Sequence, residues 1–214
     1  MTALNPSVGA LRRKFGDRIG ESLVSCGDTI VYLDAGSVRE VLTWLKEAAG
    51  QEYDYLIDVT AIEHRDPERP LEVVYLLFSL HRKQQLCVKV ALAKDGDLAV
   101  DSVVPIWQGA NWLEREVYDM FGVTFRGHPD LRRILMWETY AEGHPLRKDF
   151  PLRGRFPRSE QLRQALHANP EAHYSLEELT LAEAFGDVPR EMRDRLARGE
   201  RGNVAAPEES STGG

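Results

Sequence analysis

Three segments decide how this chain folds: NWLEREVYDMFG at residues 111–122, GHPDLRRIL at residues 127–135 and GHPLRKDFP at residues 143–151. The first segment has helical spacing, because apolar residues recur at steps of four, three, four and three up to a terminal glycine. These apolar positions are Ile106, Ala110, Leu113, Val117 and Met120. Each of the other segments is a Gly-His-Pro turn followed by basic residues. The charged helix residues, Glu114, Arg115, Glu116 and Asp119, are expected outside the apolar face.

The rest of the chain contains short helices and strands with short connections. Helical spacing predicts helices over residues 8–19 and 37–50, the second with a capping box formed by Ser37 and Glu40. Apolar runs and alternation predict strands at residues 28–33, 53–60, 71–80, 85–93 and 98–104. Only residues 81–84 separate two of these strands, which indicates an antiparallel hairpin. The pattern predicts an α+β fold, a two-layer domain of helices packed on a mixed, largely antiparallel sheet.

The chain divides by pattern into three parts. Residues 1–122 hold every strongly periodic element and are predicted to form the α+β core domain, which ends in the signature helix. Residues 123–174 are predicted to form an extended basic arm for contacts between subunits. Between Arg126 and Arg163 this arm has nine Lys and Arg residues against five Asp and Glu. Residues 175–214 are predicted to contain short helices and a disordered tail.

Composition excludes several classes of function. A net charge of −7 disfavours a general nucleic-acid binder, which needs a positive field to attract phosphates. The two cysteines, Cys26 and Cys87, lie far apart in the sequence, whereas an iron–sulfur cluster normally needs four thiolates. Neither common glycine-rich nucleotide-binding loop is present. With no apolar stretch long enough to span a membrane and no secretory segment at the N-terminus, we expect a cytoplasmic, prokaryotic protein that carries no electrons.

The three segments closely resemble the signature of a known family, the 30 kDa subunit of respiratory complex I, the proton-translocating NADH:quinone oxidoreductase. The resemblance is dense over residues 105–152, looser over residues 28–104 and absent beyond about residue 155. It implies a non-redox structural subunit of the hydrophilic arm, with no catalytic, cofactor-binding or metal-binding residue of its own. The NADH dehydrogenase activity then belongs to the complex, and FMN and the iron–sulfur clusters belong to partner subunits.

The resemblance also implies a partner and a location. The expected partner is the 49 kDa-type subunit, with neighbouring subunits of the quinone module and no nucleic acid. The chain would lie on the cytoplasmic side of the bacterial inner membrane as a peripheral subunit, and would reach the membrane only through the complex. The residues expected at the subunit interface are Glu114, Arg115, Glu116, Asp119, Phe121, Gly122, His128, Pro129, Arg132, Arg133, His144, Pro145, Arg147, Lys148, Asp149 and Phe150.

Other interpretations of the same residues remain open at this point. Carboxylates such as Glu114 and Glu116 can act as acid and base, although residues two apart on a helix point in different directions. Arg115 and Asp119 are four apart and could pair with each other. His128 and His144 lack a recognisable third or fourth metal ligand, so turns bonded to backbone or to a neighbouring subunit are expected.

Two alternatives concern the whole protein. Within the superfamily, related subunits serve membrane-bound nickel–iron hydrogenases and complexes fed by ferredoxin or a deazaflavin, and the signature alone does not separate them. A free-standing RNA-binding or scaffold protein is the more distant alternative. Arginines with interleaved aromatics suit single-stranded RNA, but acidic residues interrupt the arm and no RNA-binding motif is visible.

Overall fold

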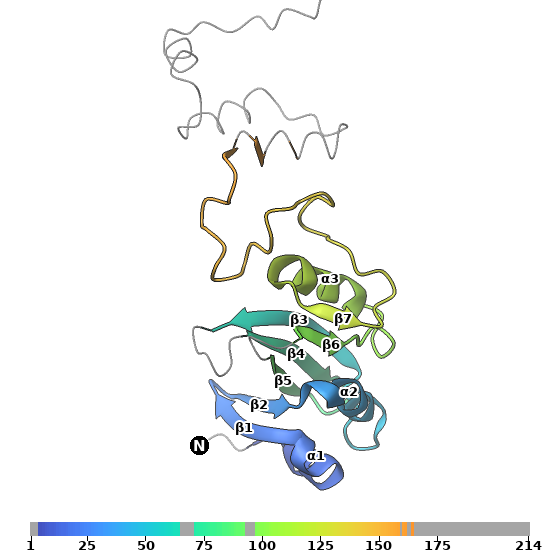
Figure 1. The fold of residues 1–214 in the computed structure, drawn as a ribbon. Coiled ribbons are helices and arrows are strands. Elements are labelled where there is room, and N and C mark those ends of the chain that lie inside the picture. The colour runs from blue at the N-terminus through green and yellow to red at the C-terminus, as the bar shows by residue number, and fades with distance from the viewer. Residues whose placement is uncertain (1–3, 65–70, 93–96, 159, 162–163, 165–214) are drawn as a thin grey trace, which may run out of the picture. The chain divides into compact units, whose positions relative to one another are not determined.

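A mixed five-stranded sheet forms the centre of the fold (Figure 1), seen in a computed structural model that describes residues 4–64, 71–92, 97–158, 160–161 and 164. The strand order is β1-β2-β5-β4-β3. The bounds are Ile19–Ser25 for β1, Asp28–Leu33 for β2, Tyr55–Glu63 for β3, Leu71–Ser79 for β4 and Gln84–Leu92 for β5. β2 and β5 run parallel, and the other neighbouring pairs are antiparallel. The predicted α+β fold with a mixed, largely antiparallel sheet is confirmed.

One face of the sheet carries the core. The register aligns Val31, Val88, Tyr75 and Val59 in one row across four strands, and none of them is more than 2% exposed. Helices α1 (Pro6–Phe15), α2 (Val38–Glu47) and α3 (Ala110–Phe121) contribute their apolar faces to the same cluster. α3 lies beside β3 at one end of the sheet (Figure 1). The helices and the sheet are therefore the two predicted layers.

The predicted capping box of the second helix is wrong. Ser37 donates its hydroxyl to the carbonyl of Asp34 at 3.0 Å, and Glu40 pairs with Arg18 at 2.5 Å. The Asp34 carboxylate accepts the amide of Gly36 at 3.0 Å and holds a short turn before α2. Ser37 belongs to that turn and is not available to cap the helix.

The compact core continues past the boundary predicted at Gly122. The next residues form β7 (Thr124–Arg126), which pairs in parallel with β6 (Ala99–Asp101). Val123 and Phe125 bury their side chains, at 0 and 2% exposure. One compact unit comprises Met1–Arg155 and a second comprises Phe156–Gly214. The described part of the arm as far as Arg155 is therefore part of the first unit, because its apolar side chains and backbone pair with it.

The second unit is described only at residues 156–158, 160–161 and 164, where the amides of Glu160 and Gln161 donate to the carbonyl of Pro157. The short helices and disordered tail predicted for residues 175–214 lie outside the described residues. Within the described part of the chain, no helix has the length and apolar character needed to cross a membrane.

Candidate functional site

The signature helix α3 directs most of its charged residues into the protein. Glu114 and Asp119 are 0% exposed and Arg115 is 8% exposed, whereas Glu116 is exposed. The prediction that all four lie outside the buried surface is therefore wrong for three of them. The segment after β7 folds back along α3 and supplies polar partners, which the spacing of apolar residues does not reveal.

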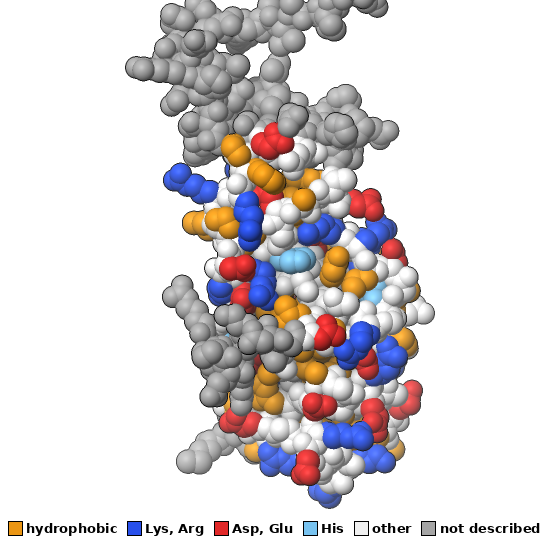
Figure 2. Space-filling model, in the orientation of Figure 1, with side chains coloured by type: hydrophobic (Ala, Val, Ile, Leu, Met, Phe, Trp, Pro, Cys, Tyr) orange, Lys and Arg blue, Asp and Glu red, His pale blue; other side chains and the backbone are white. Residues whose placement is uncertain are grey.

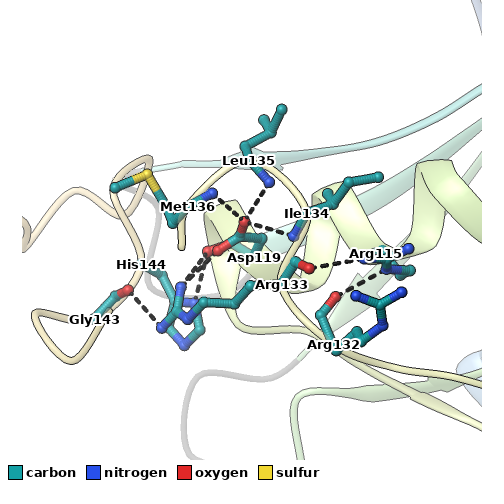
Figure 3. A network of polar contacts seen from close by, with 9 residues as sticks. All are labelled: Arg115, Asp119, Arg132, Arg133, Ile134, Leu135, Met136, Gly143 and His144. Atoms are coloured by element: carbon teal, nitrogen blue, oxygen red, sulfur yellow. Dashed lines mark hydrogen bonds and ion pairs between the residues drawn. The ribbon is translucent and has the colours of Figure 1, made fainter. Parts of the chain in front are cut away.

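The Asp119 carboxylate is the centre of this arrangement (Figure 3). Its Oδ2 accepts the backbone amides of Ile134, Leu135 and Met136 at 3.1, 2.8 and 2.8 Å, and its Oδ1 accepts Arg133 at 2.6 Å. Consecutive amides that converge on one oxygen form an anion-binding concavity. Burial would raise the pKa of Asp119, but the hydrogen bonds, led by the one from the Met136 amide, hold this pKa below its usual value. The carboxylate is an ionised structural group.

Two arginines fasten the returning segment to the helix (Figure 3). Arg115 donates to the carbonyl oxygens of Arg132 and Arg133 at 3.1 and 2.8 Å. Arg133 donates to Asp119 and also to the carbonyl of Gly143 at 3.1 Å. Arg115 and Asp119 therefore do not pair with each other, although their spacing allows it, because each binds the segment that covers the helix. Charge-assisted bonds of this kind are among the stronger hydrogen bonds in proteins.

The second Gly-His-Pro turn closes the C-terminal end of α3. His144 Nδ1 lies 3.0 Å from the carbonyl oxygen of Asp119, and the amide of Leu146 donates to the carbonyl of Met120 at 3.0 Å. Gly122 has φ +79°, the left-handed conformation that the sequence predicts, and a Cβ there would lie 2.7 Å from the His144 ring. The turn thus satisfies carbonyls that a helix leaves free at its end. We call Arg115, Asp119, Gly122, Arg133 and His144 the α3 cap.

The first Gly-His-Pro turn is built on His128. Its Nε2 lies 3.1 Å from the carbonyl oxygen of Asn111, and its Nδ1 accepts the amide of Asp130 at 3.0 Å. This pattern requires the neutral tautomer with the hydrogen on Nε2. The expectation that both histidines form turns bonded to backbone is confirmed. Among the residues that the structure describes, no cluster of three His, Cys, Asp or Glu side chains could hold a metal ion.

The other signature residues lie around the cap or at the surface. Arg147 lies 3.5 Å from Glu63 and 3.7 Å from Asp149, and the amide of Lys148 donates to Glu63 at 2.5 Å. The guanidinium of Arg155 lies 5.8 Å from the centre of the Phe150 ring. Phe121 is buried and Pro145 half-buried, whereas the exposed members are Glu116, Pro129, Arg132, Lys148 and Asp149.

Sequence reasoning missed the residues to which the signature binds. Glu63, at the end of β3, is far from Lys148 in the sequence. Tyr140 and Glu142 are buried at 6 and 3% exposure, and Glu142 accepts the amide of Arg155 at 2.5 Å. No periodicity marks these positions, because their partners are backbone groups or distant side chains.

Large apolar side chains remain exposed beside the α3 cap. Trp112, Leu135, Leu146 and Leu152 are 64, 60, 53 and 103% exposed. Figure 2 shows orange hydrophobic side chains interspersed with blue basic ones around α3 and the segment that follows β7. A hollow of about 360 Å³ lies beside the cap, with Phe121, His144, Arg147, Phe150 and Arg155 among its lining residues. Exposed apolar side chains next to arginines are typical of a protein interface.

Comparison with known proteins gives consistent matches. The model of the family described as "Respiratory-chain NADH dehydrogenase, 30 Kd subunit" matches residues 31–156, which include all three signature segments. Proteins named as the C-type subunit of NADH-quinone oxidoreductase in Brucella ovis and Brucella abortus are each 42% identical to the chain over 152 residues. The aligned region covers 71% of this chain and 74% of each relative.

Two solved structures are also similar. One is described as Nqo5 of the trypsin-resistant fragment (1–134), with 30% identity, a TM-score of 0.49, and coverage of 58% of this chain and 97% of that chain. The other is the membrane-bound sulfane sulfur reductase, described as an archaeal respiratory membrane complex. It has 24% identity, a TM-score of 0.49, and coverage of 66% of this chain and 78% of that chain.

Proposed function

Because the chain belongs to the family of the 30 kDa subunit of respiratory-chain NADH dehydrogenase, we propose that it is a non-redox structural subunit of a proton-translocating NADH:quinone oxidoreductase, complex I. The oxidoreductase activity belongs to the assembled complex, and this chain contributes no catalytic residue. FMN and the iron–sulfur clusters are held by partner subunits. The Brucella relatives are both named as a subunit of NADH-quinone oxidoreductase, which supports this assignment over a hydrogenase or a ferredoxin- or deazaflavin-fed complex.

The use of the signature side chains inside the chain is the observation that carries the proposal. Arg115 and His144 bind carbonyl oxygens, and Asp119 binds three amides and Arg133. A catalytic acid, base or metal ligand has to present a group to a substrate or an ion. These groups instead fix the conformation of the segment after β7, which supports a role in forming a surface.

The outer side of the α3 cap is the surface that we propose for docking. Trp112 and Leu135 are exposed there, and the Arg132 side chain is 57% exposed. Tryptophan and arginine are enriched among residues that dominate interface energies. The arm is basic although the whole chain has a net charge of −7, so the complementary partner surface is acidic with apolar sockets.

The 49 kDa-type subunit is the proposed partner, together with neighbouring subunits of the quinone module. In this proposal the complex lies at the bacterial inner membrane with this chain on the cytoplasmic side. The chain contacts the membrane only through the complex. The signature that carries the family resemblance surrounds the proposed docking surface, which supports a partner common to the family.

Copurification with the tagged full-length chain tests the docking surface. We expect Trp112→Ala to lower recovery of the 49 kDa-type subunit about tenfold or more, because loss of a central interface tryptophan costs about 2 kcal/mol. Leu80→Ala is the matched control, since Leu80 is 59% exposed but lies between β4 and β5, outside the signature. It should leave recovery unchanged. Normal recovery with Trp112→Ala would show that docking uses another surface. If mass spectrometry finds no subunit of this oxidoreductase with the wild-type chain, the proposed function is wrong.

A further inference from the structure

Two buried polar atoms lack hydrogen-bond partners in the core between α3 and the sheet. They are Oε2 of Glu114 and the hydroxyl of Tyr75, and both residues are 0% exposed. The charge of Glu114 acts on Tyr75, so the two groups share one region of the interior. Buried polar atoms in folded proteins are almost always paired. Two unpaired atoms in one region therefore point to a common cause.

The groups around Glu114 satisfy one carboxylate oxygen and leave the other. Oε1 accepts the amide of Val103 at 2.6 Å, and the hydroxyl of Ser102 also bonds to the carboxyl group. Arg39 of α2 attracts Glu114 from a distance, but its Nε donates to the carbonyl of Ser102 at 3.2 Å. Asp101 of β6 adds a second negative charge that acts on Tyr75. No described cation forms an ion pair with Glu114, although the residue is fully buried.

We propose that Glu114 and Tyr75 form a proton-binding site, in which the Glu114 carboxyl holds a proton on Oε2 and donates it in a hydrogen bond to the Tyr75 hydroxyl. The bond forms after a small shift of either side chain or through one internal water. A protonated carboxyl has one O–H donor and a hydroxyl has two acceptor lone pairs, so one proton satisfies both atoms. The site is separate from the docking surface and does not depend on the proposed function.

The ionisation of both groups agrees with this geometry. Burial raises the pKa of Glu114 to about 7, although the hydrogen bonds from Val103 and Ser102 oppose the rise. Burial, with the charges of Glu114 and Asp101, raises the pKa of Tyr75 well above its usual value. Tyr75 therefore keeps its own proton, and Glu114 is the group that gains and loses one near neutral pH.

Protonation of Glu114 makes the stability of the domain depend on pH. The folded pKa of about 7 lies above the value of 4.5 for an unperturbed glutamate. The contribution to stability is therefore complete below pH 4.5 and is lost as the pH rises through 7. Through this group alone, the folding equilibrium constant should fall on the order of 70-fold between about pH 5 and pH 8.

Comparison of the full-length chain with Glu114→Gln tests the site. The amide keeps the shape, accepts from Val103 and donates to Tyr75, and it has no proton to lose. The ratio of folding constants, variant over wild type, should therefore rise on the order of 70-fold from about pH 5 to pH 8 in urea unfolding. Glu116→Gln, on the exposed side of the same helix, is the control and should give a constant ratio. A constant ratio for Glu114→Gln would overturn the proposal.

Infrared spectroscopy of the folded chain detects the proton without reference to stability. At about pH 6 the wild type should show a carboxylic-acid C=O band that disappears above pH 7 and is missing from Glu114→Gln. Tyr75→Phe removes only the acceptor, so the band should move to higher frequency. A wild type without this band contradicts protonation of Glu114. A band at unchanged frequency in Tyr75→Phe contradicts the assignment of Tyr75 as its acceptor.

Discussion

Asp119→Ala is expected to destabilise the first compact unit by about 3–5 kcal/mol, the range for removing one partner of a buried ion pair. Asp119 is 0% exposed, and its loss leaves three amides and Arg133 without their acceptor. The Arg133 side chain is only 14% exposed, so solvent replaces little of the lost interaction. Urea unfolding of the full-length chain at neutral pH measures the difference.

Asp130→Ala is the matched control for this change. Asp130 lies in the same segment and pairs with Arg132 at 2.8 Å, but its side chain is 55% exposed. Its removal should alter stability by no more than about 0.5 kcal/mol. The lowered pKa of Asp119 adds a pH signature: its contribution is present above pH 3.8 and is lost as the pH falls through the folded pKa. Equal costs for the two variants would contradict a structural role for the Asp119 carboxylate.

Gly122→Ala is expected to cost about 2–4 kcal/mol, from a left-handed backbone conformation and from crowding in a packed region. The added Cβ would lie 2.7 Å from the Cδ2 and Nε2 atoms of His144. His144 cannot move away freely, because its Nδ1 lies 3.0 Å from the carbonyl of Asp119. The end of α3 and the second Gly-His-Pro turn should therefore separate.

Gly50→Ala isolates the backbone part of that cost. Gly50 has φ +81°, close to the +79° of Gly122, but nothing lies within 4 Å of its added Cβ. Gly50→Ala should cost only about 1 kcal/mol in the same thermal or urea unfolding experiment. If both substitutions cost the same, the contact between Gly122 and His144 does not stabilise the protein.

The elements that could be predicted from the sequence are those fixed by local pattern. The spacing up to Met120 and the glycine after Phe121 predicted α3 and its left-handed end, because both signals lie within the helix itself. The hairpin of β4 and β5 followed from two apolar runs and a short connection. Ile19 was assigned to the first helix and lies in β1 instead, because helical spacing alone does not show where a helix stops.

The environment of the signature could not be predicted in the same way. Charged residues are normally exposed, so Glu114 and Asp119 were expected at the surface. Their burial depends on partners that have no side-chain signal, such as the amides of Ile134 and Leu135, or on residues distant in the sequence. The core was expected to end at Gly122 for the same reason, since hydrogen bonds rather than apolar periodicity hold the following segment.

The central claim is that the signature forms structure and performs no chemistry, and turnover per assembled complex tests it most directly. Arg115→Glu should disrupt the bonds to the carbonyls of Arg132 and Arg133 and lower the amount of assembled complex in membranes. NADH:quinone turnover divided by the quantity of assembled complex should stay within about twofold of the wild type, since the substitution removes no group that acts in the transition state. A normal amount of complex with abolished turnover would contradict the claim and assign the signature to catalysis or proton coupling.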